Sequence, residues 1–410
     1  MKLRTYTYLL FLVILVVGFT TSNSIVQTIQ KVSVTELHTT NTYTADEEII
    51  LKFKANETTN IALVVKSSYG ISILDSEKKE DTLVFKIPSF LSKKRGVINY
   101  KLVFNSQEIY SGNLHVKASK VIKEPLESYL GPTSITAGGK DYGMFTIIPA
   151  DKYDNPIEDS TLVTIKHQFL NLEKDSDLFI DDFIVWKNIY SYQKSGRILV
   201  SANTNNLASK EFTLDVFPSQ AQDFELNASK KHEYADGNQI VEFFTSEIKD
   251  EYGNTISDGR IVEFSILTNH NEQLRSSGTT IKGVARGYMV HPVKASLWKA
   301  QAFIPEMAES DELVLEFKPA VKDYTITFTE DKRNIKVGAI LSFMNQIIPD
   351  GAMISLNIYR SGTLIETFTN FSSKGFVEFY LSDDFFPKGE YTLEVIGMGI
   401  RKKYDHIVLE

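Results

Sequence analysis

The chain of 410 residues contains no cysteine. A disulfide framework, a thiolate nucleophile and a cysteine-based metal site are therefore excluded. The absence does not assign a compartment, because an exported protein can also be built without disulfides. In an oxidising compartment, such a fold must be stabilised by packing alone.

An excess of positive charge is also missing. The 44 lysines and arginines are outnumbered by 52 aspartates and glutamates, which gives a net charge of −8. The basic residues are scattered, whereas phosphate backbones are bound by clustered lysine and arginine. We therefore expect no nucleic-acid partner.

Motifs of catalysis and metal binding are scarce as well. The seven histidines form no H-x-H or H-x-x-x-H pair, so one element alone does not supply two metal ligands. No G-x-S-x-G, P-loop or G-x-G-x-x-G stretch stands in a strand-to-helix context. We expect a protein that is not an enzyme, with no catalytic residues and no cofactor-binding residues.

Long hydrophobic runs are absent beyond the N-terminus. The run over residues 8–19 holds about 12 apolar side chains, and a membrane-spanning helix needs roughly 20. A basic segment (1–4) precedes this run and a small polar segment (20–24) follows it, as in a secretory signal peptide. The sequence predicts a signal peptide over residues 1–24 and a mature chain without a transmembrane span, which is periplasmic, at the cell surface or secreted. An uncleaved N-terminal anchor is the alternative.

Aromatic and β-branched side chains are abundant. The 26 phenylalanines and 19 tyrosines, with many Val, Ile and Thr, suit a pleated, half-buried surface. Short alternating runs such as 49–54 and 100–104 are separated by turn residues, and helical patterns are few. Strands at this spacing indicate an all-β protein made of sandwiches or barrels.

Two segments repeat each other at an offset of 99 positions, ADKYDNPIEDSTLVTI at 150–165 and KDEYGNTISDGRIVEF at 249–264. A third, weaker copy begins at residue 349. The motif residues are Asp151, Tyr153, Asn155 and Asp159 in the first copy, Asp250, Tyr252, Asn254, Asp258 and Gly259 in the second, and Asp350 and Gly351 in the third. A period of roughly 95 to 100 residues is the size of an immunoglobulin-like β-sandwich, so we expect about four such modules in tandem.

The repeated motif has a local physical meaning. Its Asp-x-Tyr-x-Asn part supplies side chains that bond their own backbone in Asx turns. Asp258-Gly259 follows as a tight-turn pair, in which glycine accepts a positive φ. We expect the two turns to connect neighbouring strands, and Tyr153 and Tyr252 to pack against a domain edge.

Three segments of the third module carry a family resemblance: ADGNQ at 235–239, KDEYGNTISDG at 249–259 and GVA at 283–285. They resemble the bacterial immunoglobulin-like (Big) domain of invasins and intimins, with its pattern A-D-G-x-x, K-D-x-x-G-N-P-V-x-D-G and a D-x-x-G-x-A-type turn. The second module matches in part, with Ser160 in place of the glycine. The resemblance implies a building block of bacterial surface proteins, and it implies no role for the whole molecule.

Two shorter segments resemble features of Bacteroidetes envelope proteins. GEYTLEV at 389–395, with a basic segment at 401–403, is similar to the C-terminal sorting domains of the type IX secretion route. The same strand is equally expected at the end of a plain immunoglobulin-like or macroglobulin-like sandwich. Asp81-Thr82-Leu83 resembles a short O-glycan acceptor of that phylum. Together they imply a Bacteroidetes envelope protein.

The repeats, with Pro125 and Pro218 close to two linkers, divide the chain into five parts. These are the signal peptide 1–24, immunoglobulin-like sandwiches at 25–119, 120–217 and 218–318, and an immunoglobulin-like or macroglobulin-like sandwich at 319–410.

Four aspartates form a candidate calcium site: Asp175, Asp177, Asp181 and Asp182. Ca²⁺ takes six to eight oxygen ligands, which such a segment supplies. The spacing is not that of an EF-hand and Lys174 dilutes the charge, so a solvated acidic loop is the alternative.

Trp186 and Trp298 both lie in strand-like segments. Core packing is the ordinary expectation for each ring, and an exposed ring would instead be an aromatic platform for a sugar or a protein. Exposure in a structure separates the two interpretations.

These observations predict an exported, non-enzymatic multi-module binding or scaffold protein of the bacterial cell envelope or surface. Adhesion or protein–protein interaction is the expected role, and the partner is an envelope or surface protein or a polysaccharide. The alternatives are an accessory structural subunit of a secretion or gliding-type machine and a carbohydrate-binding periplasmic protein.

Overall fold

The computed structural model describes residues 32–56, 59–79 and 81–410. The predicted signal peptide lies outside the described residues. Within these ranges the chain is built almost wholly of strands, and the one helix is the four-residue α2 (Ser89–Ser92). No helix there has the length and apolar character needed to cross a membrane. The all-β prediction is confirmed.

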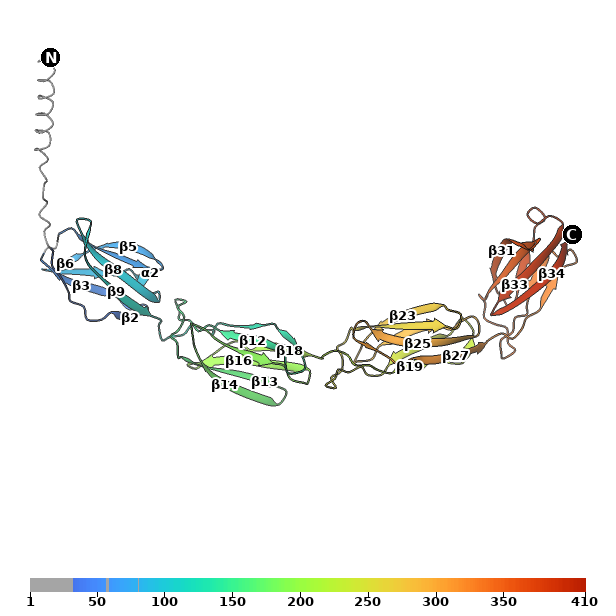
Figure 1. The fold of residues 1–410 in the computed structure, drawn as a ribbon, viewed down its shortest axis with the longest axis horizontal. Helices are drawn as coiled ribbons and strands as arrows, with labels where there is room; N and C mark the ends of the chain where they lie inside the picture. The colour runs from blue at the N-terminus through green and yellow to red at the C-terminus, as the bar shows by residue number, and fades with distance from the viewer. Residues whose placement is uncertain (1–31, 57–58, 80) are drawn as a thin grey trace, which may run out of the picture.

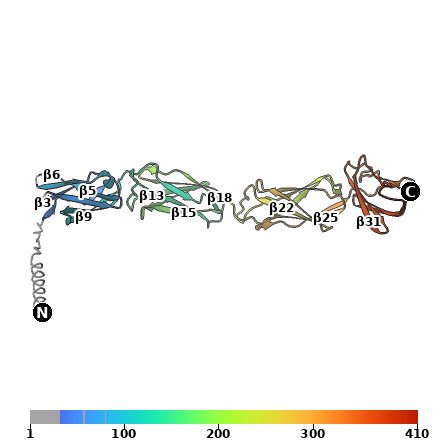
Figure 2. The same ribbon diagram turned by 90° about the horizontal axis from the view of Figure 1, so that it is seen from above.

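In the described residues, four separate hydrophobic cores follow one another along the chain. Their buried residues lie within 45–116, 118–216, 221–317 and 321–409, and we call the sandwiches around them the first to the fourth module. Figure 1 shows the modules end to end in a gently curved row, and Figure 2 shows the same row from above. The expected tandem array is therefore confirmed, while the boundaries near 119, 217 and 318 stay predictions.

The first module packs a sheet of order β1-β3-β7-β6 against one of order β2-β9-β8-β4-β5. Among the described strands of this module, only β2 and β9 pair in parallel. The strands are β1 (Val34–Glu36), β2 (Thr42–Thr44), β3 (Ile50–Ala55), β4 (Ile61–Ser67), β5 (Gly70–Asp75), β6 (Glu77–Lys79), β7 (Thr82–Lys86), β8 (Gly96–Phe104) and β9 (Gln107–Lys117).

The second and third modules share one topology. Each has a three-stranded sheet, β10-β12-β15 or β19-β21-β24, facing a larger sheet of order β11-β18-β16-β13-β14 or β20-β27-β25-β22-β23. Short strands β17 and β26 add to β16 and β25. In each larger sheet the first strand runs parallel to the last strand of the module.

The strands of the second module are β10 (Ser128–Gly131), β11 (Ser134–Thr136), β12 (Tyr142–Ile147), β13 (Leu162–Phe169), β14 (Leu172–Phe179), β15 (Val185–Tyr190), β16 (Gly196–Thr204), β17 (Leu207–Ala208) and β18 (Phe212–Phe217). Those of the third are β19 (Leu226–Ser229), β20 (Tyr234–Ala235), β21 (Ile240–Thr245), β22 (Ile261–Thr268), β23 (Gln273–Thr279), β24 (Arg286–Val290), β25 (Ser296–Ile304), β26 (Ala308–Glu309) and β27 (Leu313–Pro319).

The fourth module pairs a sheet of order β28-β29-β32 with one of order β31-β30-β33-β34. The strands are β28 (Ile326–Phe328), β29 (Asn334–Val337), β30 (Met353–Arg360), β31 (Thr363–Phe371), β32 (Val377–Tyr380), β33 (Gly389–Gly397) and β34 (Ile400–Leu409).

Alternation along each strand builds the cores. On β22, Val262, Phe264 and Ile266 are buried and the residues between them point outward or lie at the margin. Trp298 of β25 is 1% exposed and packs beside Phe317, with ring centroids 4.7 Å apart. The core interpretation of Trp298 is therefore confirmed.

Candidate functional site

A buried aspartate, Asp151, organises the repeated turn of the second module. One of its carboxylate oxygens accepts the backbone N–H groups of Tyr153 and Asn155, at 2.8 and 3.0 Å. The other accepts the side-chain amide of Asn155 at 2.9 Å and the backbone N–H of Ser119 at 2.8 Å. The carboxylate therefore ties the turn to the segment that enters the module.

Asp250 makes the same four bonds in the third module. It accepts the backbone N–H of Tyr252 at 2.9 Å, and both the backbone N–H and the amide of Asn254 at 2.8 Å. The backbone N–H of Ser219 donates to it at 2.8 Å. Burial raises the pKa of Asp250, but these hydrogen bonds together outweigh burial and leave the pKa below its ordinary value.

Asn155 joins the second module to the first. Its amide N–H donates to the carbonyl oxygen of Lys93 and its amide oxygen accepts the N–H of Arg95, both at 2.8 Å. The guanidinium of Arg95 donates in return to the carbonyl oxygens of Pro156 and Ile157, at 2.8 and 3.0 Å. The carboxamide thus pairs with the backbone of another module as a neighbouring strand would, and we call this contact an asparagine clasp.

A second asparagine clasp joins the third module to the second. Asn254 donates its amide N–H to the carbonyl oxygen of Gln193 at 2.7 Å, and its amide oxygen accepts the N–H of Ser195 at 2.9 Å. The same side-chain amide is held from behind by Asp250. The same asparagine contact therefore joins the first module to the second and the second to the third.

The tyrosines of the motif also face the preceding module. Tyr153 packs against the core of the first module, and the ammonium of Lys93 lies 5.5 Å from its ring centre. Tyr252 lies against Gly138 of the second module, where an added Cβ would stand 3.1 Å from the tyrosine hydroxyl. The edge that each tyrosine contacts belongs to the module before its own.

The second turn of the motif recurs in three modules. Asp258 and Asp350 each accept, at 2.6 Å, the backbone N–H of the residue 24 positions later. The glycines that follow them have φ of +84° and +97°, a conformation that glycine adopts without strain. In the second module Ser160 takes this place with φ 67°, and the corresponding bond to Asp159 is longer, at 3.4 Å.

The junction between the third and fourth modules is aromatic instead. The turn of the fourth module is closed by the bond from the N–H of Ser342 to the carbonyl oxygen of Gln346, at 2.8 Å. Between them, Phe343 stacks on Tyr234 of the third module, with ring centroids 3.5 Å apart and planes 7° from parallel. An aromatic stack takes the place of the clasp.

A histidine–aspartate group lies beside this stack. His232, Asp236 and His291 are the only described residues whose potential metal-ligand atoms gather in a group of three within 4.8 Å. However, Nδ1 of His232 accepts the N–H of Tyr234 at 3.2 Å, so its other nitrogen, 3.4 Å from Asp236, carries the hydrogen. Nδ1 of His291 donates to the carbonyl oxygen of Tyr234 at 2.9 Å. Both nitrogens facing the carboxylate thus lack a free lone pair, and the two histidines are held by hydrogen bonds to the backbone of Tyr234. The histidines lie far apart in the chain, so no local pattern indicates it.

The candidate calcium residues do not gather in such a group within the described part of the chain. Asp175 and Asp177 lie on β14, where the first pairs with Lys166 at 3.6 Å and the second accepts the hydroxyl of Thr164 at 2.7 Å. Asp181 and Asp182 lie in the turn after that strand. The calcium site therefore stays a prediction.

The second module exposes aromatic side chains on the outer face of its three-stranded sheet. Tyr142 and Tyr190 oppose each other across β12 and β15, with ring centroids 5.3 Å apart. Tyr129 of β10 and Trp186 of β15 lie on either side of one residue of β12, and they are 56% and 52% exposed. We call these four residues the aromatic face. The core interpretation of Trp186 is wrong, because the neighbouring Val185 takes the inward position.

The corresponding faces of the other modules are charged. The first module presents Lys54 on β3. The third carries an ion pair between Arg286 and Glu242 at 2.6 Å, and the fourth carries one between Lys336 and Glu378 at 2.9 Å. The uncharged aromatic face of the second module therefore differs from its equivalents.

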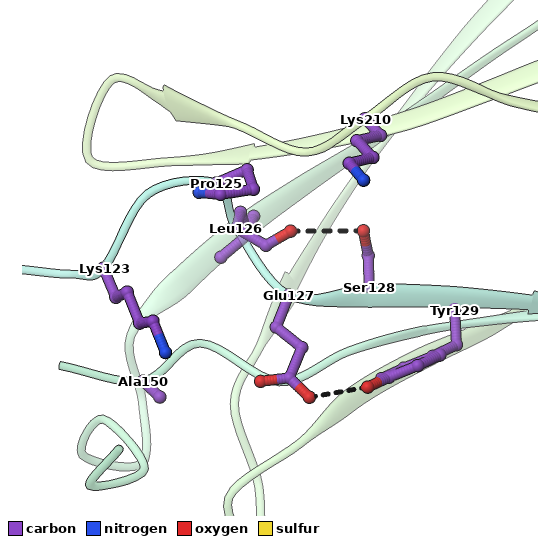
Figure 3. Close-up of a pocket in the computed structure, with 8 residues that line it drawn as sticks. All are labelled: Lys123, Pro125, Leu126, Glu127, Ser128, Tyr129, Ala150 and Lys210. Carbon is purple, nitrogen blue, oxygen red and sulfur yellow. Dashed lines mark hydrogen bonds between the residues drawn. The ribbon is translucent and has the colours of Figure 1, made fainter. Parts of the chain in front are cut away.

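A shallow hollow of about 270 Å³ adjoins Tyr129 (Figure 3). The hydroxyl of Tyr129 donates to Glu127 at 2.7 Å, and this bond raises the pKa of the tyrosine. Lys123, on the opposite wall, pairs with Asp154 at 2.8 Å. Lys210, which also lines the hollow, forms no ion pair among the described residues, so the hollow adds a positive charge beside Tyr129.

No protein-family model and no curated protein matches the chain. Among solved structures, the Escherichia coli adhesin FdeC is 13% identical, with 70% of this chain and 96% of that chain covered and a TM-score of 0.46. Invasin, a bacterial integrin-binding protein, is 12% identical over 92% of this chain and 78% of that one, with a TM-score of 0.46. The Yersinia pseudotuberculosis adhesin InvE is 14% identical, covering 48% and 60%, with a TM-score of 0.28. The solved structures similar to this chain thus include bacterial adhesins with immunoglobulin-like domains.

Proposed function

We propose that the chain is an exported, non-enzymatic protein of the bacterial envelope or surface, which presents a binding face for adhesion or protein–protein contact. The two asparagine clasps carry this proposal. Each fixes one module against the preceding one by a pair of backbone hydrogen bonds. Modules held in fixed directions project a face away from their anchoring point, whereas freely jointed modules sample many directions.

The aromatic face supplies the surface to be presented. Tyrosine and tryptophan combine a large apolar body with a polar tip, and they are enriched where proteins bind partners. Trp186 and Tyr190 are each 52% exposed on the outer face of the three-stranded sheet. The partner in this proposal is a surface protein or a polysaccharide. Module boundaries near 24, 119, 217 and 318 belong to the proposal as well.

The test is recovery of the full chain, expressed with a C-terminal tag, from fractionated bacterial cells. We expect a mature N-terminus near residue 25 and attachment of the purified chain to a target surface. Trp186→Ala combined with Tyr190→Ala should weaken attachment, and Tyr288→Ala, an exposed tyrosine of the third module, should not. Retention in the cytoplasm, or attachment to no surface, contradicts the proposal.

Co-purification from envelope fractions with and without EDTA separates the remaining interpretations of the function. A stoichiometric membrane complex in both conditions would support an accessory subunit of an envelope machine instead. Attachment that is lost with EDTA and regained with Ca²⁺ would support the calcium site predicted at Asp175, Asp177, Asp181 and Asp182.

A further inference from the structure

A cleft opens in the second module between the edges of its two sheets, β14 of the larger and β15 of the smaller. Its volume is about 520 Å³. The lining side chains that matter here are His167, Lys174, Lys187, Asn188, Tyr190 and Tyr192. Because Tyr190 also belongs to the aromatic face, the cleft and the aromatic face are continuous.

The same gap is closed in the third module. There the backbone N–H of Tyr288 on β24 donates to the hydroxyl of Ser276 on β23, at 3.1 Å. A Cβ added to Gly278 would stand only 2.0 Å from the carbonyl oxygen of Arg286. The two edges therefore touch as closely as glycine permits.

Larger side chains hold the gap open in the second module. In the strand registers, Lys187 takes the place of Gly287, because each pairs with the inward phenylalanine of the adjacent strand. Leu178 likewise takes the place of Gly278. The ammonium of Lys187 reaches across the gap to the hydroxyl of Ser176 at 2.6 Å. The cleft is thus built by specific substitutions between two modules of one topology.

Positive charge predominates in the cleft. Within the described part of the chain, Lys174 and Lys187 form no ion pair, and the carboxylate that also lines the cleft, Asp175, pairs with Lys166 at 3.6 Å. Burial, reinforced by the two lysines, lowers the pKa of His167, so that the imidazole is uncharged at neutral pH. An anionic group entering the cleft meets two ammonium groups.

Two buried polar atoms of residues that line the cleft lack a hydrogen-bond partner among the residues that the structure describes. They are Nδ1 of His167 and Oδ1 of Asn188. The other nitrogen of His167 lies 3.4 Å from the hydroxyl of Tyr192. Buried polar atoms are almost always paired in proteins, so a ligand with several hydroxyl groups fits this wall.

We propose that the cleft binds a saccharide that bears a carboxylate, such as a chain of uronic acid units. Lys174 and Lys187 hold the carboxylate through charge-assisted hydrogen bonds. His167 and Asn188 meet sugar hydroxyls, and Tyr190 offers its ring to the C–H face of a neighbouring unit. An acidic peptide brings carboxylates without the adjacent hydroxyls and ring faces. The inference rests on the proposed binding function and names its ligand class and site.

The test is calorimetric titration of the full chain with hexagalacturonate, beside the neutral hexasaccharide cellohexaose and hexaglutamate. We expect hexagalacturonate to bind and the other two to bind at least about tenfold more weakly. Lys174→Ala combined with Lys187→Ala should weaken hexagalacturonate binding by roughly tenfold or more, because two charged hydrogen-bond donors are removed. Lys187→Arg keeps the charge and should bind within about threefold of the parent.

A matched control removes the same charge elsewhere. Lys231→Ala combined with Lys322→Ala changes two exposed lysines outside the second module and should leave binding unchanged. Unchanged thermal unfolding of all variants shows that the fold is retained. Absence of hexagalacturonate binding overturns the inference, as does equal weakening in both double variants or equally tight binding of hexaglutamate.

Surface attachment and oligosaccharide binding are separate measurements. A chain that attaches to surfaces but does not bind hexagalacturonate contradicts this inference alone. A chain that attaches to no surface contradicts the proposed function, whatever it does with the oligosaccharide.

Discussion

At the scale of single residues, the carboxylate of the repeated turn has two structural roles. Asp250 holds the turn of its own module and orients the Asn254 carboxamide, which then reaches the second module. A side chain that satisfies several buried N–H groups is costly to replace, because each donor left unpaired keeps its desolvation penalty. The stability of the turn and the contact between the third and second modules therefore both depend on Asp250.

The lowered pKa of Asp250 gives a testable pH dependence. A carboxylate whose pKa is lower in the folded state stabilises it above the unfolded value, about 3.9, and this contribution is lost as pH falls through the folded pKa. We expect the free energy of unfolding of the third module, measured with urea, to fall below pH about 4. Asp250→Asn should be less stable at pH 7 and should lose part of this acid sensitivity. Equal pH profiles for parent and variant would contradict the assignment.

The sequence alone predicts the hydrogen bonds within the turn, but not the contacts between modules. The bonds from Asp151 to the N–H groups two and four positions later are local, so the Asp-x-Tyr-x-Asn pattern is enough to predict them. The bond from Asn155 to Lys93 spans 62 positions, and no local pattern encodes it.

Among the strands, the pleat decides which side chains reach solvent. Val185 and Ile189 of β15 point into the core, so Trp186 and Tyr190 must point outward. A shift of one residue would exchange these sets. Residues 183–186 are all large and apolar, so the sequence does not show which of them point into the core. The alternation around Trp298 does show it. For the same reason the open edge beside β15 could not be foreseen, since it depends on the register that sets Lys187 opposite a phenylalanine.

The two tryptophans should therefore behave differently. Trp298→Ala should lower the free energy of unfolding by about 3–5 kcal/mol, because it leaves a cavity beside Phe317. Trp186→Ala should change it by about 0.5 kcal/mol or less. Urea unfolding followed by circular dichroism measures both.

Fluorescence provides an independent readout, since the chain has only these two tryptophans. In Trp298→Phe the remaining Trp186 should be quenched readily by acrylamide, and in Trp186→Phe the remaining Trp298 should resist quenching. Similar quenching constants would place both rings in similar surroundings, against the structure.

Across the whole molecule, the junctions are of two kinds. Asparagine clasps join the first three modules, and the stack of Phe343 on Tyr234 joins the fourth. The period of the repeats is enough to expect the modules. Their relative directions are not predictable from it, because the residues that set them look like ordinary turn residues. An aromatic stack is less directional than paired hydrogen bonds.

Phe343→Ala should loosen only the last junction. Spin labels at Glu316→Cys and Glu366→Cys should show a broader distance distribution in the variant than in the parent. The stability of the two flanking modules should fall by about 1 kcal/mol or less, since the stack lies between cores. An unchanged distribution would mean that other contacts hold the fourth module.

The central claim is that the asparagine clasps fix the direction of successive modules. The chain lacks cysteine, so Thr213→Cys and Glu316→Cys place two unique spin labels on either side of the second junction. Double electron–electron resonance should give one narrow distance distribution in the labelled parent and in Asn238→Ala, an exposed asparagine of the third module used as control. Asn254→Ala should broaden the distribution markedly. A distribution as broad in the parent as in Asn254→Ala would contradict the account.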